Sequence, residues 1–348
     1  MGVISVHVLF EHGADHKPFG VAYIRDILPL SYPTNSQIFK VTSGTTYQQA
    51  DVIIIERMWK PGATLSQVQE LVDQVRSDRG CLVYSIDDNL LDLDHIPVEA
   101  RMAARFLCRE AHGVLVSTNF LRSRLNHLNP KIYVLPNALD ERLFEVHGRR
   151  AAIHSTDPEH KTIGYMGTFT HDADLMMVFQ ALRRILRKYQ NNLQFHIVGG
   201  VSDPSIYKMF KELPIKLLRV PVKDVSYPNF IKWMANNTCW DLGIAPLENT
   251  FFNRSKSDIK FLDYSAFGIP GIYSHVPSYE KSVQHLKTGY LAWNTPADWS
   301  EGFELLLSND QLRLELAKSA QDYVFSKRTL KQCAVNWRDA ILDILNSS

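Results

Sequence analysis

Residues 253–270 read NRSKSDIKFLDYSAFGIP and predict a short helix with a definite end. Gly268 can adopt the left-handed conformation that closes a helix, and Pro270 cannot continue one. Ile259 and Leu262 are spaced to lie on one face of this helix. The segment is therefore expected to pack an apolar face against a core and to end in a turn.

Two lysines and a carboxylate are predicted to share a stripe beside that apolar face. Lys256, Lys260 and Asp263 are spaced three and four apart, so they meet on a helix. A helix start presents free N–H groups and partial positive charge, which together with lysines favour a diphosphate. Asp263, one turn deeper, can accept hydrogen bonds from sugar hydroxyls. The stripe indicates a nucleotide-sugar site; the alternative is an ordinary amphipathic helix with a solvated polar face.

Length and composition indicate a soluble protein of two domains. The chain has 348 residues, of which 45% are apolar and 22% charged. Its net charge of +1 lacks the basic excess that nonspecific nucleic-acid binding usually requires. Four widely spaced cysteines without metal-type spacing suggest reduced thiols in a cytosolic protein. No run reaches 18 consecutive apolar residues, so any membrane contact is expected to be peripheral.

Short apolar runs alternate with helical patterns along both halves of the chain. Near-continuous apolar strands separated by helices indicate parallel sheets covered on both faces. The runs expected to form strands are Val3–Phe10, Val52–Ile55, Cys81–Ile86, Val114–Ser117, Ile132–Leu135, Thr162–Met166, Leu193–Gly199, Lys216–Val220, Asp241–Pro246 and Gly271–Tyr273.

Two helices and a linker complete the expected organisation. The clearest helical pattern spans residues 173–189, and another spans 329–345. Residues 146–161 are polar and turn-prone, which is typical of a linker. We therefore expect one α/β domain over residues 1–150 and a second over 151–328.

Ligands of such sheets bind beyond the carboxyl ends of the strands. In the second half, a glycine at such an end lets a ligand approach the backbone. A proline can flank a flat base, and a glutamate suits a ribose or a donor sugar. His171 can contact a phosphate or sugar, or cap a helix. The donor-binding residues expected from these strand ends and from the 253–270 segment are Gly167, Thr168, His171, Gly199, Pro221, Glu248, Arg254, Ser257, Asp258, Lys260 and Asp263.

In the first half, Asp87 and Asp88 end a strand and are candidates to orient or deprotonate an acceptor hydroxyl. Arg57 also follows a strand and can hold an anionic or hydroxyl-rich acceptor, or pair with a local carboxylate. Gly20 and Arg25 lie in an early loop and helix start that are expected to face the acceptor.

A metal site is not predicted. Asp92 and Asp94 form an Asp-x-Asp pattern, but a three-residue acidic match is common by chance. The 13 histidines show no ligand spacing. No hydrolase motif of the Gly-x-Ser-x-Gly or His-Glu-x-x-His type occurs.

Taken in order, several segments of the chain resemble GT-B glycosyltransferases, closest to the large retaining group called family 4. Each segment is short, but the ordered set covers most of the chain. The segments that carry the resemblance are residues 51–57, 84–90, 111–118, 135–140, 163–168, 195–200 and 256–270.

This resemblance implies two doubly wound Rossmann-like domains facing a central cleft. It places the acceptor in the N-terminal domain, which the final helix of residues 329–348 rejoins, and the donor in the C-terminal domain. The family usually carries two glutamates eight residues apart. Asp263 matches the second, which binds the nucleotide ribose, whereas Ser255 replaces the first. Arg and Lys do not follow Gly167-Thr168, so Lys256 and Lys260 are expected to supply that charge instead.

The expected reaction is transfer of a hexosyl group from a dTDP-, UDP- or GDP-sugar to a hydroxyl of a saccharide or lipid-linked saccharide. Lys256 and nearby backbone N–H groups would stabilise the leaving diphosphate, so no metal or other cofactor is expected. The resemblance implies retention at the anomeric carbon and a place in polysaccharide or glycoconjugate synthesis, with rhamnosyltransferases that use a dTDP-sugar as the most similar variant. The expected location is the cytoplasm or the inner membrane face, beside other assembly enzymes.

Three alternatives remain open. A nucleotide-sugar epimerase can share this architecture. A degenerate, non-catalytic nucleotide-sugar-binding module is favoured by the missing carboxylate at Ser255. A metal-dependent GT-A transferase would need one nucleotide-binding half and a working Asp-x-Asp.

Overall fold

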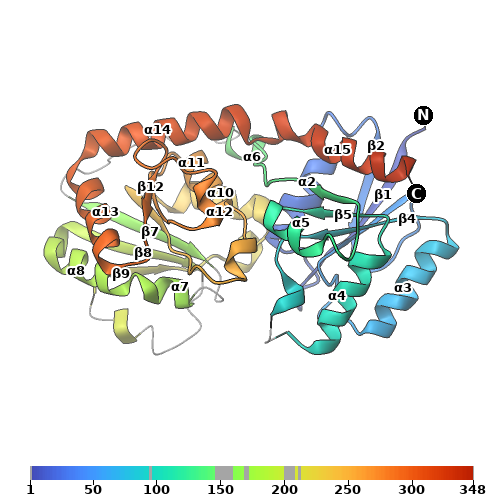
Figure 1. Ribbon diagram of the computed structural model, residues 1–348. Helices are drawn as coiled ribbons and strands as arrows, with labels where there is room; N and C mark the ends of the chain where they lie inside the picture. Colours follow the sequence, from blue (N-terminus) through green and yellow to red (C-terminus); the bar gives the residue numbers. More distant parts are fainter. Residues whose placement is uncertain are drawn as a thin grey trace. The chain divides into compact units, whose positions relative to one another are not determined.

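The computed structural model describes residues 2–93, 96–145, 160–167, 172–199, 208–210 and 213–347. The chain divides into two units (Figure 1). The first comprises Met1–Asp140, Ser255–Ser257 and Thr329–Ser348, and the second comprises Glu141–Arg254 and Asp258–Arg328. Each unit contains one six-stranded parallel sheet flanked by helices, which confirms the predicted doubly wound α/β class.

The strand order is β2-β1-β3-β4-β5-β6 in the first unit and β12-β11-β10-β7-β8-β9 in the second. The ten predicted strands are present, with ends shifted by one or two residues at most positions. In the first sheet the bounds are β1 Ile4–Leu9, β2 Phe39–Gly44, β3 Val52–Glu56, β4 Cys81–Ile86, β5 Gly113–Val116 and β6 Ile132–Val134. In the second sheet they are β7 Lys161–Gly167, β8 Leu193–Gly199, β9 Ile215–Leu218, β10 Leu242–Ala245, β11 Gly271–Ser274 and β12 Tyr290–Ala292.

Alternating side chains of the first sheet fill two separate cores. Ile53 and Ile55 face α3 (Leu65–Ser77), α4 (Val98–Glu110) and α5 (Asn119–Leu125). Val52 and Ile54 face the opposite way. That second face is covered by α1 (Gly20–Ala22), the π-helical turn η1 (Tyr23–Ile27), α2 (Leu28–Leu30) and α15 (Leu330–Asn346). Burial on both faces explains why these strands are continuously apolar.

The second sheet is likewise covered on both faces. One face packs against α7 (Asp172–Met177), α8 (Phe179–Tyr189) and α13 (Pro296–Ser308). On the other, Gly164 and Gly243 lack side chains and leave room for the rings of Trp240 and Tyr264. Leu316 of α14 (Asp310–Lys327) also belongs to the core on the first of these faces. The other helices described in this unit are α6 (Arg142–Glu145), α10 (Tyr227–Asn237), α11 (Ile259–Ala266) and α12 (Pro277–Glu280).

Several sequence expectations need correction. The pattern over 173–189 forms two helices, α7 and α8, separated at buried Val178. The helix of the 253–270 segment is shorter than expected, because α11 begins at Ile259 and a separate 3-10 turn, η6, spans Asn253–Ser255. Strands β2 and β12 were not predicted, because β2 is largely polar and partly exposed and β12 has only three residues.

The division into units also differs from the expected boundary at residue 150. The first unit gives way to the second between Asp140 and Glu141, and most of the expected linker lies outside the described residues. Residues Ser255–Ser257 belong to the first unit, although they were placed in the second domain. No helix among the described residues combines the length and apolar character that a membrane span needs.

The contact between Gly164 and Trp240 gives a test of the second core. A Cβ built on Gly164 would lie 1.7 Å from Cδ2 of the Trp240 indole, which is 5% exposed and cannot rotate away. We therefore expect Gly164→Ala to lower the free energy of unfolding by about 3 kcal/mol. Chemical denaturation measures this change. Gly2→Ala is the control, because nothing lies within 4 Å of its added Cβ. Equal stability of the two variants would contradict this packing.

Candidate functional site

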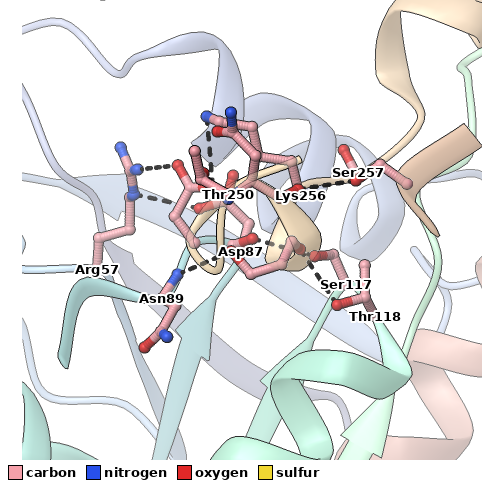
Figure 2. Close-up of polar contacts among 12 residues, drawn as sticks. Arg57, Asp87, Asn89, Ser117, Thr118, Thr250, Lys256 and Ser257 are labelled. Atoms are coloured by element: carbon pink, nitrogen blue, oxygen red, sulfur yellow. Dashed lines mark hydrogen bonds and ion pairs between the residues drawn. The ribbon is translucent and has the colours of Figure 1, made fainter. Parts of the chain in front are cut away.

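A charged cluster lies at the carboxyl edge of the first sheet (Figure 2). Strands β1, β3 and β4 are neighbours, so the residues that follow them come together. The guanidinium of Arg57 lies 3.0 Å from Oε2 of Glu11, 3.1 Å from Oδ1 of Asp87 and 2.7 Å from Oδ2 of Asp88. Arg57, which follows β3, thus bridges three carboxylates from the ends of two other strands, β1 and β4. This local pairing is one of the two roles predicted for Arg57.

The backbone of Arg57 is held in a rarely used conformation. Its φ angle is +50°, a left-handed value that costs a non-glycine residue roughly 1–2 kcal/mol. The N–H group of Arg57 donates to the carbonyl oxygen of Ser85 at 2.9 Å, which fixes this turn beside β4. Such local strain concentrates at functional sites. The turn aims the guanidinium at the carboxylates instead of at solvent.

Burial shifts the protonation of the acids in this cluster. Burial raises the pKa of Glu56 well above its ordinary value, against the attraction of Arg57. It also raises the pKa of Asp87, again opposed by Arg57. The pKa of Asp26 rises to about 7 for the same reason, with the neighbouring Arg25 opposing the shift. Acids poised in this way can hold or accept a proton near neutral pH.

Residues Ser255–Ser257 form a short segment that is fastened to this edge. The N–H group of Asn89 donates to Oγ of Ser255 at 3.3 Å, and the hydroxyl of Thr118 donates to the carbonyl oxygen of Ser255 at 3.2 Å. The side-chain amide of Asn137 donates to Oγ of Ser257 at 2.9 Å. These contacts come from the ends of β4, β5 and β6, and they fix the segment from both of its ends.

Because the segment Ser255–Ser257 is held at both ends, the side chain of Lys256 lies beside the carboxylates. Its ammonium group lies 3.7 Å from Oδ1 of Asp88 (Figure 2). Lys256 therefore does not share a helix stripe with Lys260 and Asp263, because α11 starts three residues after it. This prediction was wrong about position, but it singled out a cation that lies in the charged cluster.

Arg25 was expected to contact an acceptor, but the structure buries it to 1% exposure. Its guanidinium donates to the carbonyl oxygen of Leu135 and, at 3.0 Å, to Oδ1 of Asn137. Arg25 therefore stands behind Asn137 and helps to orient the amide that holds Ser257. Gly20, five residues earlier, opens α1.

The second sheet presents a different edge. Gly167 and Gly199 are register partners at the ends of β7 and β8. Gly199 has a φ of +101°, and a Cβ there would lie 1.9 Å from the carbonyl oxygen of Gly167, so only glycine fits. The N–H group of Glu248 donates to Oδ1 of Asp174 at 2.7 Å. Two further predicted donor residues, Thr168 and His171, lie outside the described residues.

Asp258, predicted to bind the donor, is already engaged. Its carboxylate receives two hydrogen bonds from Arg328, at 2.8 and 3.0 Å, and one from the hydroxyl of Ser282. The side chain is nearly buried and does not cap α11. Its carboxylate therefore fixes the start of α11 to the end of α14, and only the backbone remains for a ligand.

The other predicted donor residues are dispersed. The ammonium group of Lys260 lies 5.0 Å from the ring centroid of Tyr165. Arg254 donates to Oδ1 of Asn249 at 3.0 Å, and Pro221 precedes the turn η5 (Val222–Asp224). Asp263 is 4% exposed and accepts a hydrogen bond from the hydroxyl of Tyr227 at 2.8 Å. Asp263 thus lies on the buried side of α11, not on an accessible polar stripe with Lys256 and Lys260, as was expected.

Within the described part of the chain, no group of three or more His, Cys, Asp or Glu side chains is arranged to hold a metal ion. Asp92 instead accepts hydrogen bonds from Asn89 at 2.8 Å and from Arg124 at 3.1 Å. Asp94, its partner in the Asp-x-Asp pattern, lies outside the described residues.

Sequence reasoning did not single out several members of the first-unit site. Glu11, Asn89, Thr118 and Asn137 all take part in its contacts, and each lies within three residues of a strand end. The strand-end rule that selected Asp87 therefore applied to them as well. Nothing in the sequence favoured these four residues over the other polar residues that follow strands.

Comparison with known proteins gives a family match for part of the chain and a fold match for all of it. Residues 160–309 match the family model for glycosyl transferases group 1. This segment is less than half of the chain and, apart from Ser255–Ser257, belongs to the second unit. The full chain has the GT-B fold. No curated protein matches the sequence.

Solved structures share the fold at low sequence identity. The crystal structure of HepE from Anabaena in complex with UDP and glucose is 12% identical, has a TM-score of 0.67, and is matched over 98% of this chain and 100% of HepE. A glycosyltransferase from Rickettsia africae ESF-5 is 11% identical, with a TM-score of 0.65 and complete coverage of both chains. TarM from S. aureus is 16% identical over 85% of this chain and 55% of TarM, with a TM-score of 0.61.

The buried Asp263 gives a pH-dependent prediction. Burial raises its pKa to about 7, so between about pH 4 and 7 the folded state keeps a proton that the unfolded state loses. Stability from this group is therefore complete below about pH 4 and is lost as the pH rises to 7. Asp263→Asn removes this loss, and we expect the variant to gain stability over the parent by up to about 4 kcal/mol across that range.

Urea denaturation at pH 4.5, 6 and 7.5 measures the difference in free energy of unfolding between variant and parent. Asp73→Asn is the control, because Asp73 is exposed on α3. A difference that stays constant with pH for Asp263→Asn would contradict the buried, protonated state.

Proposed function

We propose that this protein transfers a glycosyl group from a nucleoside-diphosphate sugar to a hydroxyl of a saccharide acceptor. The observation that carries the proposal is the group 1 glycosyltransferase match in the second unit of a chain with the GT-B fold. The charged cluster at the first sheet supports it, because it offers carboxylates and cations where ligands of parallel sheets bind.

The second unit is proposed to hold the donor. Its glycine-lined edge at Gly167 and Gly199 lets a diphosphate approach the backbone. UDP is the first nucleotide to test, since HepE, with the same fold, was crystallised with UDP and glucose. Asp263 would contact the ribose only if its hydrogen bond with Tyr227 were broken. Glu248 and the backbone at the start of α11 are therefore proposed to make the donor contacts.

The first unit is proposed to hold the acceptor and to take up its proton. The acceptor oxygen forms a bond to the anomeric carbon while the bond from that carbon to the diphosphate oxygen breaks. The leaving diphosphate carries the bonding electrons, and Asp88 or Asp87 receives the hydroxyl proton. Lys256, with backbone N–H groups of residues 256–258, would stabilise the charge on the leaving group.

Retention at the anomeric carbon and independence of metal ions are parts of this proposal. The resemblance to the retaining family 4 enzymes supports retention. Cations already present at Arg57 and Lys256 support a reaction without a metal. Activity that survives excess EDTA and yields a product with the donor's anomeric configuration would support both parts, whereas a chelator-sensitive reaction would exclude the second.

One observation favours a second candidate, a non-catalytic nucleotide-sugar-binding module. Ser255 takes the place of a family glutamate, is 0% exposed, and uses its hydroxyl to accept the N–H group of Asn89. A donor sugar therefore gains no carboxylate from this position. Nucleotide binding without turnover across acceptors would support the module. Interconversion of sugars in the absence of an acceptor would indicate the epimerase.

Donor binding can be measured without knowing the acceptor. A nucleotide at 100 times its dissociation constant should stabilise the protein by about 2.7 kcal/mol, seen as a rise in melting temperature. We expect this rise with UDP or another nucleoside diphosphate and not with the free nucleoside, because the diphosphate supplies most of the contacts. Absence of a shift with UDP, dTDP and GDP alike, at millimolar concentrations, would contradict a donor site.

Lys256 provides the sharpest test of the catalytic part. With an acceptor identified by product analysis, Lys256→Ala should lower kcat by roughly 10²-fold, as expected when one group that stabilises developing charge is lost. Lys40→Ala, which changes an exposed lysine of the same unit, should leave kcat unchanged. Circular dichroism checks that both variants fold. Equal turnover in the parent and in Lys256→Ala would exclude the proposed role.

A further inference from the structure

Trp293 is unusually exposed for a tryptophan. It presents 59% of its surface to solvent, although this side chain is highly buried on average. It directly follows β12, and His275 directly follows the neighbouring strand β11. Both residues therefore stand at the carboxyl edge of the second sheet, where parallel sheets bind ligands.

The two rings form a single aromatic surface, here called the Trp293–His275 platform. Ser274 and Ala292 are register partners, so the two residues beyond them emerge side by side. The N–H group of His275 donates to the carbonyl oxygen of Ala292 at 2.7 Å. The ring centroids lie 4.0 Å apart, with 39° between the ring planes. The imidazole thus supports one side of the indole.

The surrounding backbone fixes the platform in place. The N–H group of Trp293 donates to Oδ2 of Asp298 at 3.0 Å. The next residue, Asn294, donates from its side-chain amide to the carbonyl oxygen of Leu247 at 2.9 Å. A backbone anchored at Trp293 and at the next residue holds the platform in position, so a ligand that stacks on it orders little further chain, which favours binding.

The polar groups around the platform select the kind of ligand. Oε1 of Glu280 lies 3.6 Å from Nε2 of His275, and Asp298 lies against the backbone of Trp293. Two carboxylates at the rim disfavour a phosphate and can accept hydrogen bonds from hydroxyls. A protein partner would require a larger continuous apolar patch, but Asn294 and Thr295 follow Trp293 directly. An uncharged ring with apolar C–H groups on its faces and hydroxyls at its rim fits best.

We propose that the Trp293–His275 platform is a saccharide-binding subsite on which one pyranose ring of a glycan stacks. The subsite is connected to the expected donor edge, because the N–H group of Leu247 donates to Oγ of Ser274 at 2.8 Å and Glu248 follows directly. It is separate from the diphosphate contacts proposed at Gly167 and Gly199. The inference rests on the proposed function only in taking the bound glycan to be part of the acceptor or product.

The full-length protein tests this directly. Isothermal titration and saturation-transfer NMR are carried out with maltohexaose, cellohexaose and chitohexaose as probes. We expect at least one hexaose to bind the parent protein, with NMR contacts to indole protons. Trp293→Ala should weaken that binding by roughly tenfold or more, as for an aromatic anchor, and Trp293→Phe, which keeps a ring, by less.

Trp233→Ala is the matched control. Trp233 is a partly exposed tryptophan on α10 that stacks with Phe230 at a centroid distance of 6.4 Å, and it lies within a helix, not directly after a strand. Its replacement should leave hexaose binding unchanged. Melting curves for all variants establish that loss of binding does not follow from loss of folding.

Parallel titrations with UDP separate this inference from the proposed function. Hexaose binding that depends on Trp293, with an unchanged UDP-induced melting shift in Trp293→Ala, supports the subsite. The subsite also stands if UDP fails to bind even the parent, although the proposed function then falls. Failure of all three hexaoses to bind, or equal binding by parent and Trp293→Ala, overturns the subsite. Loss of UDP binding in Trp293→Ala would assign the platform to the nucleobase and overturn it as well.

Discussion

The first-unit site depends on the ion pairs that the Arg57 guanidinium makes with three carboxylates. A parallel sheet brings the ends of all its strands to one edge, and in this chain the ends of β1 and β4 carry three carboxylates, Glu11, Asp87 and Asp88. Their mutual repulsion in a poorly solvated place would oppose folding. Arg57 relieves it by bridging all three. Such a buried network is a poor way to gain stability, so its retention at a ligand-binding edge indicates function.

The route of the chain adds a second constraint. Residues Ser255–Ser257 belong to the first unit, while Arg254 and Asp258 on either side belong to the second. Immediately after this excursion, Asp258 is held by Arg328, the last residue of the second unit before α15. One ion pair therefore links two residues that each stand next to a point where the chain passes from one unit to the other. The ion pair therefore fixes the position of Asp258, the residue at which the chain re-enters the second unit after the segment that carries Lys256.

Much of this fold could be predicted from the sequence, because parallel strands buried on both faces must be apolar throughout. The pattern marks β3 and β4 clearly and fails for β2, whose polar residues reflect its position at the sheet edge. Asp87, Asp88 and Arg57 were found by the same logic. Asp263 was misplaced because its burial depends on Tyr227, 36 residues away, which no local pattern reports.

The charges at the two sheets support the proposal that the first sheet binds the acceptor and the second binds the donor. At the first, the carboxyl groups of Asp26 and Glu56 join those bridged by Arg57, and Arg25 and Lys256 are the other cations. Five acids thus meet three cations, and raised pKa values of Asp26, Glu56 and Asp87 reduce the remaining negative charge. Under the proposed function, such an edge suits a neutral hydroxyl whose proton must leave, and Lys256 adds positive charge beside it. At the second sheet, Gly167 and Gly199 leave the backbone open to a diphosphate, and the charge of Asp258 is neutralised by Arg328.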